Sequence, residues 1–277
     1  MRRSAGAWIV PALAAVALCG CGASGDPLKQ VTGAVSKTLA VRWARYEVAL
    51  ERTRLFAAPI AVLGGRAASD FQTGLGYEFL QLKLRAGVYQ TLFFDLEPST
   101  FLLSPSPAPA GALPSGKIWI SVPLTGPAGD PALAAQAEGL APVLLLDEIA
   151  WGARSASSVG ARVVQSVPME EYRVSVDLGL ALAGAVRARR GAIAAAITKE
   201  LTAAASGRVS ITVWVSGPGY VGKIESDVPG SGLGSASFWF LSYTKPYTGS
   251  GPPASQIVPL ASLARGGRSL WAIATGS

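Results

Sequence analysis

Three short motifs in the chain have the spacing of catalytic or nucleotide-binding sites, but each lacks something that its chemistry needs. Residues 217–222 match G-x-G-x-x-G, but a β-rich segment follows instead of a helix, and no acidic residue occurs after Asp227. Residues 111–117 have phosphate-loop spacing, but Ile118 stands where a hydroxyl group must reach Mg²⁺. Residues 242–245 fit S-x-x-K without the companion elements of penicillin-recognising enzymes. We therefore assign no catalytic or nucleotide-binding role to any of them, and we expect a hairpin turn at residues 217–222 and a surface loop up to residue 115.

The composition excludes further classes of site. The chain has 277 residues and no histidine, so it has no Ser-His-Asp or Cys-His nucleophile and no imidazole ligand for a metal. Glu170 and Glu171 are neighbours on an expected strand and point to opposite faces, so they cannot share a proton or a metal. Asp147 and Glu148 are expected to be solvated helix charges. The sequence predicts no enzyme, no cofactor and no metal.

The N-terminus has the pattern of an export signal. Arg2 and Arg3 precede an apolar run over residues 5–18, which as a helix spans roughly 21 Å, short of the ~30 Å hydrocarbon core. The run ends in Leu-Cys-Gly-Cys, which resembles a bacterial lipobox with Cys21 at the acylated position. An ordinary secretory signal with two incidental cysteines is the alternative. We expect residues 1–20 to be removed, and residues 21–36 to tether the protein to membrane lipid on the extracytoplasmic face of the cell membrane.

Charge adds little about partners. The net charge is +7, but the basic residues are scattered and the chain is expected to be exported, which argues against nucleic acid. A basic cluster at Arg187, Arg189 and Arg190 opens an expected helix. It is either a solvated helix start or a lip that meets anionic lipid headgroups.

Hydrophobic periodicity predicts many strands and two helical inserts. The expected strands cover residues 41–50, 71–84, 88–96, 100–103, 117–122, 160–167, 171–178, 208–216, 220–228 and 235–243. The strands at 160–167 and 171–178 are expected to join tightly at Pro168 and Met169. The helical inserts are expected at residues 132–151, broken near Pro142, and at 191–205. This pattern predicts an α+β domain with a single antiparallel sheet of eight or more strands. A sheet of this length must curl or be covered, which leaves either an apolar cavity or a filled core.

Three segments carry a family resemblance. Residues 158–178 contain spaced glycine and valine residues followed by Y-x-x-x-V-D, residues 213–223 contain V-W-V and an outgoing basic strand, and residues 116–120 read G-K-x-W. In this pattern and spacing the chain resembles the actinobacterial lipoproteins of the LppX/LprG group, from about Lys37 to Val258. Arg162, Ser166 and Ser216 depart from the group's pattern, and all three lie in or beside expected turns.

The resemblance implies a fold and a function. The fold is a half-open β-barrel like that of the LolA and LolB carriers, with helices across the concave face of the sheet, over residues 37–258 and followed by a C-terminal tail at 259–277. The implied function is binding of hydrophobic acylated lipids or glycolipids and their movement across the envelope by a monomer, with a membrane lipid exporter as a partner and without catalysis. The alternative is an envelope lipoprotein with a filled core that acts as a structural or protein-interaction module. Side chains expected to line the lipid pocket are Phe79, Phe94, Ile120, Val176, Val213 and Phe240.

Overall fold

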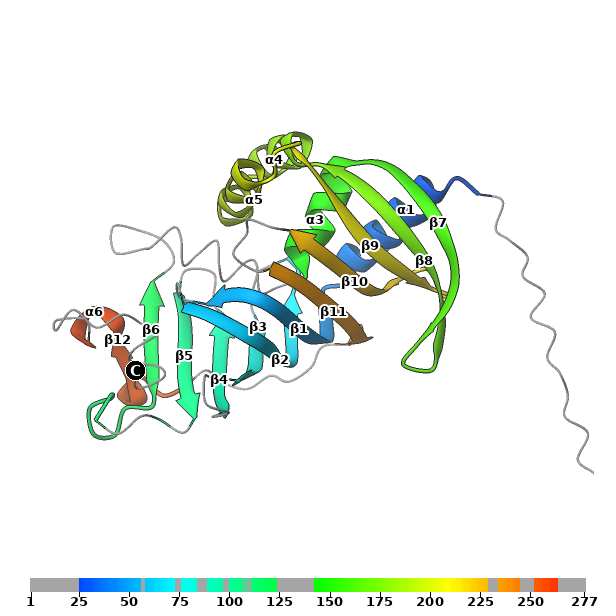
Figure 1. Ribbon diagram of the computed structural model, residues 1–277. Coiled ribbons are helices and arrows are strands. Elements are labelled where there is room, and N and C mark those ends of the chain that lie inside the picture. The colour runs from blue at the N-terminus through cyan, green and yellow to red at the C-terminus, as the bar shows by residue number, and fades with distance from the viewer. Residues whose placement is uncertain are drawn as a thin grey trace, which may run out of the picture.

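The protein forms one long curved sheet with helices packed against part of its concave side (Figure 1). The computed structural model describes residues 25–55, 58–72, 76–83, 89–96, 100–106, 108, 111–123, 142–228, 234–244 and 252–263. The architecture is α+β with a sheet that does not close, as the sequence predicted.

Twelve strands make up the sheet in the described residues, in the order β12-β6-β5-β4-β3-β2-β1-β11-β10-β9-β8-β7. Neighbouring strands are antiparallel, except that β12 and β6 run parallel. The pairing of β1 with β11 joins two meanders into one sheet. The strands are β1 (Trp43–Leu55), β2 (Ala58–Asp70), β3 (Gly76–Lys83), β4 (Tyr89–Leu96), β5 (Thr100–Ser106), β6 (Trp119–Pro123), β7 (Ala153–Val164), β8 (Val167–Asp177), β9 (Arg208–Ser216), β10 (Val221–Val228), β11 (Gly234–Ser242) and β12 (Ile257–Pro259).

Strand β2 was not predicted from the sequence, and the bounds predicted for the next strand, at residues 71–84, are wrong as a result. β2 is rich in Ala and Gly and shows no clear alternation of apolar and polar residues. The run at 71–84, expected to be one strand, instead begins in the turn after β2, at Phe71 and Gln72, and continues into β3. An alternation counted through a turn does not keep its phase, because the turn reverses the strand direction.

The β7–β8 hairpin turns earlier than expected, and a helix follows it. Gln165 and Ser166 have φ of 48° and 66°, as a two-residue type I′ turn requires, so the turn precedes Pro168 and Met169. After β8, Asp177 caps helix α4 (Leu178–Arg187) by accepting a hydrogen bond from the Leu180 amide at 3.1 Å. The sequence does not predict this helix, because its apolar start at Leu178 continues the alternation of the strand before it.

The remaining helices are α1 (Pro27–Ala40), α3 (Val143–Gly152), α5 (Gly191–Ala203) and the short α6 (Leu260–Leu263), with a 3₁₀ turn at Ala254–Gln256. Helix α1 corrects the expected tether, since the chain is helical from Pro27 onward. Asp26 caps this helix by accepting from the Leu28 amide at 3.0 Å, and Val31, Ala34, Val35 and Thr38 form one buried stripe. Helix α6 packs on β6 and β12, so the ordered fold also extends past residue 258.

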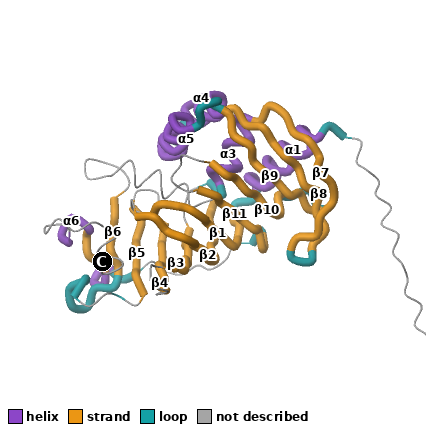
Figure 2. The backbone as a smooth tube through the Cα atoms, in the orientation of Figure 1, coloured by secondary structure: helices purple, strands orange, loops and turns teal. Residues whose placement is uncertain are grey.

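The helices cover one half of the sheet. Helices α1 and α3 pack against each other and against β7 to β10, while α4 and α5 pack on α3 (Figure 2). The main helix contacts in the described residues therefore lie on the β7–β10 half and, through α6, at β6 and β12. Strands β1 to β5 bring an apolar inner face to the same core without a main contact from a described helix.

Candidate functional site: the concave face of the sheet

An unbroken row of apolar register positions crosses the concave face. Paired residues of antiparallel strands share a face, so one row can be followed from strand to strand. It runs across nine strands as Tyr172, Val213, Ile224, Phe238, Val48, Gly65, Leu80, Leu92 and Pro105. Apart from the Tyr172 hydroxyl, no position in this row carries a polar side chain.

A second row lies on the same face and reaches the other edge of the sheet. It runs through Phe240, Tyr46, Ala67, Glu78, Phe94, Leu103, Ile120 and Val258. Glu78 is its one charged position. The two rows make the concave face apolar from β8 at one end to β12 at the other.

Five of the six residues expected to line a pocket share this face. Ile120, Val176 and Val213 are fully buried in the hydrophobic core, and Phe240 packs at its margin. Phe94 belongs to the second row by register, but its side chain lies outside those described.

Phe79 is the exception. It pairs with Arg66 and Phe93 and therefore lies on the convex face, while its neighbour Leu80 is fully buried on the concave face. The phase of this strand was counted from Phe71, which sits in the turn before it. The residue of this strand that faces the concave side is therefore Leu80, one position after Phe79.

An aromatic stack runs from the edge of helix α1 into this face. The ring centroids are 4.8 Å apart between Tyr220 and Tyr243, 5.7 Å between Tyr243 and Phe240, and 6.1 Å between Phe240 and Tyr46. The Lys37 Nζ lies 4.3 Å from the centroid of the Tyr220 ring. Of these residues only Phe240 was predicted as part of a site, because the members come from distant segments and no spacing in the sequence links them.

Hydrogen bonds tie the end of α1 to this stack. The Val221 amide donates to Thr38 Oγ1 at 3.0 Å, and the Tyr243 hydroxyl donates to the Val221 carbonyl. Burial raises the pKa of Tyr243 well above its usual range, so this hydroxyl keeps its proton and stays a donor. The stack is therefore a fixed part of the wall between α1 and the sheet.

The acidic residues of α3 are buried, which corrects the expectation that they are solvated. Asp147 and Glu148 are 4% and 0% exposed, and Glu200 of α5 is 1% exposed. Arg190 lies 3.6 Å from the Asp147 carboxylate, so this arginine of the basic cluster faces a buried acid. Burial raises the pKa of Glu148 well above its usual range, and the neighbouring Glu200 carboxyl raises it further.

The two glycine-rich look-alikes fall at a turn and in a loop, and Ser242 of the third ends strand β11. Residues 217–219 turn the chain between β9 and β10, with Gly219 at φ 81°, and residues 111–116 form a loop before β6. Lys245 lies outside the described residues, as do Cys19 and Cys21. Within the described segments, no group of three or more Cys, Asp or Glu side chains could hold a metal ion. Nor does any helix in those segments have the length and hydropathy to cross a membrane.

Comparison with known proteins gives similarity at the level of structure. No protein-family model matches the chain, and no curated protein matches its sequence. The structure is similar to LprF from Mycobacterium bovis, with 13% identity and a TM-score of 0.45 over 81% of this chain and 97% of that one. It is also similar to the Mycobacterium tuberculosis lipoprotein LppX, with 11% identity and a TM-score of 0.44 over 80% of this chain and 96% of that one. LppX is one of the proteins for which the group that the sequence resembles is named.

Proposed function

We propose that the chain is a lipid-anchored envelope protein that binds acylated lipids or glycolipids on the concave face of its sheet and carries them across the envelope. It acts without catalysis, as a monomer. The observation that carries the proposal is the apolar concave face, which continues well beyond the strands on which α1 and α3 pack. Acyl chains bind by apolar burial, worth about 25 cal/mol per Å², and such a face offers many contacts without directional chemistry.

The anchor is proposed from the sequence. Acylated Cys21 would hold the protein at the extracytoplasmic face of the cell membrane, and a membrane lipid exporter would be a partner on the same route. Two or more acyl chains suffice for stable anchoring, at about 0.8 kcal/mol per buried CH₂.

A filled core is the second candidate. Ile120, Val176 and Val213 have no exposed surface and belong to one continuous hydrophobic core. In this alternative the same side chains fill the space completely, and the protein acts as an envelope interaction module without a lipid ligand.

A matched pair of bulky substitutions separates the two candidates. Val213 lies in the half of the face on which α1 and α3 pack, whereas Leu103 lies in β5, beyond the main contacts of those helices. We expect Val213→Trp to lower stability by about 1–3 kcal/mol through overpacking. Leu103 is as fully buried as Val213, so Leu103→Trp should lower stability too, and in the carrier it should in addition displace lipid, because acyl chains would lie on this half of the face.

The measurement is native mass spectrometry of the full chain purified from membranes in mild detergent, with the melting temperature taken in parallel. Co-purified lipid in the wild type and its loss in Leu103→Trp support the carrier. Absence of lipid in the wild type, with destabilisation by both substitutions, supports the filled core instead.

A further inference from the structure

The tip of the β7–β8 hairpin has exposed apolar side chains on both of its faces, since Val163 pairs with Pro168 and Val167 pairs with Val164. Seven large hydrophobic residues are exposed in the described part of the chain, and three of them lie on this hairpin. Val163 is 74% exposed, Val167 44% and Val159 39%. β7 is an edge strand of the sheet. We refer to Val159, Val163 and Val167 as the valine tip.

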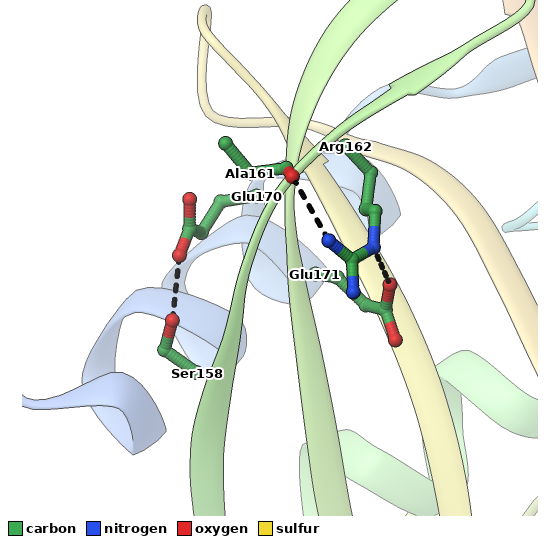
Figure 3. A network of polar contacts seen from close by, with 5 residues as sticks. All are labelled: Ser158, Ala161, Arg162, Glu170 and Glu171. Carbon is green, nitrogen blue, oxygen red and sulfur yellow. Dashed lines mark hydrogen bonds and ion pairs between the residues drawn. The ribbon is translucent and has the colours of Figure 1, made fainter. Parts of the chain in front are cut away.

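The polar side chains around the valine tip are bound to one another. Ser158 donates to Glu170 at 2.5 Å, and Arg162 donates to Glu171 at 3.2 Å on the other side of the hairpin (Figure 3). The turn residue Gln165 donates to Glu47 of β1 at 3.2 Å, which ties the turn to the body of the sheet. Because these charges are paired, the apolar side chains are the part of the tip that offers contact to a partner.

The start of the described chain lies beside this hairpin. Gln30, in the first turns of α1, accepts a hydrogen bond from the Tyr172 hydroxyl of β8, and α1 packs on β7 (Figure 1). Four residues lie between Cys21 and Asp26, and the five steps that join them span at most about 17 Å. From Tyr172 to Pro168 at the tip is four residues, roughly 13 Å of strand. An anchored Cys21 therefore lies on the β7–β8 side of the sheet, as the valine tip does.

We propose that the valine tip is a second membrane contact, which inserts at the bilayer interface and fixes how the anchored protein is oriented. The inference rests on the proposed anchoring through Cys21. The partner that we propose is a lipid bilayer, because the segment that leads to Cys21 begins on the same side of the sheet as the β7–β8 hairpin. Two irregularities in the register of β7, at Ala153/Ser155 and at Ser158/Gly160, disfavour addition of a partner strand along the same edge. Insertion of apolar side chains adds to the anchoring that acyl chains supply.

The contact is driven by apolar burial, so it should not require anionic lipid. We expect it on vesicles of phosphatidylcholine alone, since Arg162 is already paired with Glu171. Val186 of α4 is the matched control, because it is 62% exposed and lies on a helix away from the hairpin.

The test attaches an environment-sensitive fluorophore to Val163→Cys or to Val186→Cys in the acylated protein, in which the introduced cysteine is the one free thiol because Cys19 is removed with the signal and Cys21 is acylated. Each protein is reconstituted on phosphatidylcholine vesicles that contain brominated acyl chains as quenchers. We expect loss of fluorescence at position 163 and unchanged fluorescence at position 186.

Every other outcome overturns the proposal. If the protein floats with the vesicles but the label at 163 keeps its fluorescence, the tip contact is wrong and the anchor stands. If the protein does not float, the anchor itself fails and the tip contact fails with it. Equal quenching at both positions, or a signal at 163 that disappears on dilution of the protein within the vesicles, indicates non-specific adsorption or a contact between copies.

Discussion

Glu148 of α3 and Glu200 of α5 place two carboxyl groups side by side in the interior, where neither residue is more than 1% exposed. Both oxygens of Glu148 lack a hydrogen-bond partner among the described residues. Two ionised carboxylates cannot be accommodated there, because burial and mutual repulsion both disfavour the charged form. The packing of α5 on α3 therefore depends on at least one of these two carboxyl groups keeping its proton.

Stability should accordingly fall as the pH rises. The raised pKa of Glu148 means that the folded state holds a proton that the unfolded state releases above its ordinary pKa of about 4.3. The stabilising effect is complete below that pH and is lost as the pH rises through the folded pKa. Glu148→Gln should therefore match the wild type in acid and exceed it in melting temperature at alkaline pH. Asp227→Asn, at an exposed position, is the control and should show no such difference.

Gly65 is required by close backbone packing between β2 and β3. A Cβ atom at this position would lie 1.8 Å from the Phe79 carbonyl oxygen, so the strands would have to separate. At the adjacent Gly64 the nearest atom, the Val48 carbonyl oxygen, is 3.5 Å away, an ordinary contact. We expect Gly65→Ala to cost about 1–3 kcal/mol in the free energy of unfolding, and Gly64→Ala clearly less. Equal effects in a denaturant titration would contradict this pairing of β2 with β3.

The buried hydroxyl of Thr38 satisfies the Val221 amide. Thr38→Val keeps the shape but leaves that amide without its partner, which should cost about 1–3 kcal/mol. Thr38→Ser retains the acceptor and should lose much less. Thermal unfolding of both variants checks the difference, and a Thr38→Val protein as stable as wild type would show that the hydrogen bond contributes nothing.

The proposed anchoring depends on the sulfur of Cys21. Cys21→Ala should prevent acylation and release the protein into the soluble fraction. Mass spectrometry of the intact protein and salt-washed membrane fractions measure the two effects. Retention of the variant on washed membranes would contradict the lipobox interpretation, whereas Cys19→Ala should leave anchoring unchanged.

The amount of bound lipid should depend on side chains of the concave face and not on those of the convex face. Phe240 is on the concave face, so Phe240→Ala should reduce co-purified lipid modestly, since many contacts share the binding. Phe79 is on the convex face, so Phe79→Ala should leave the amount of lipid unchanged even if stability falls. Lipid extraction and quantification per protein compares the two, and a larger loss with Phe79→Ala would refute the register of β3.

The sequence alone determined the antiparallel α+β sheet, because alternation of apolar residues in strands such as β9 to β11 is a local property that survives without knowledge of the partners. It also predicted that the G-x-G-x-x-G segment is a turn. It did not predict β2, whose small residues show no alternation of apolar and polar positions. As a consequence it assigned Phe79 to the wrong face of the sheet.

Only the tertiary structure decided how distant segments combine. No local pattern could pair β1 with β11, bury Glu148 against Glu200, or stack Tyr220 on Tyr243, because each contact joins residues far apart in the chain. The same holds for α1, whose polar N-terminal sequence predicted a tether until its apolar stripe was found against the sheet. Local periodicity specifies which face of an element is apolar, whereas the burial of that face depends on the elements packed against it.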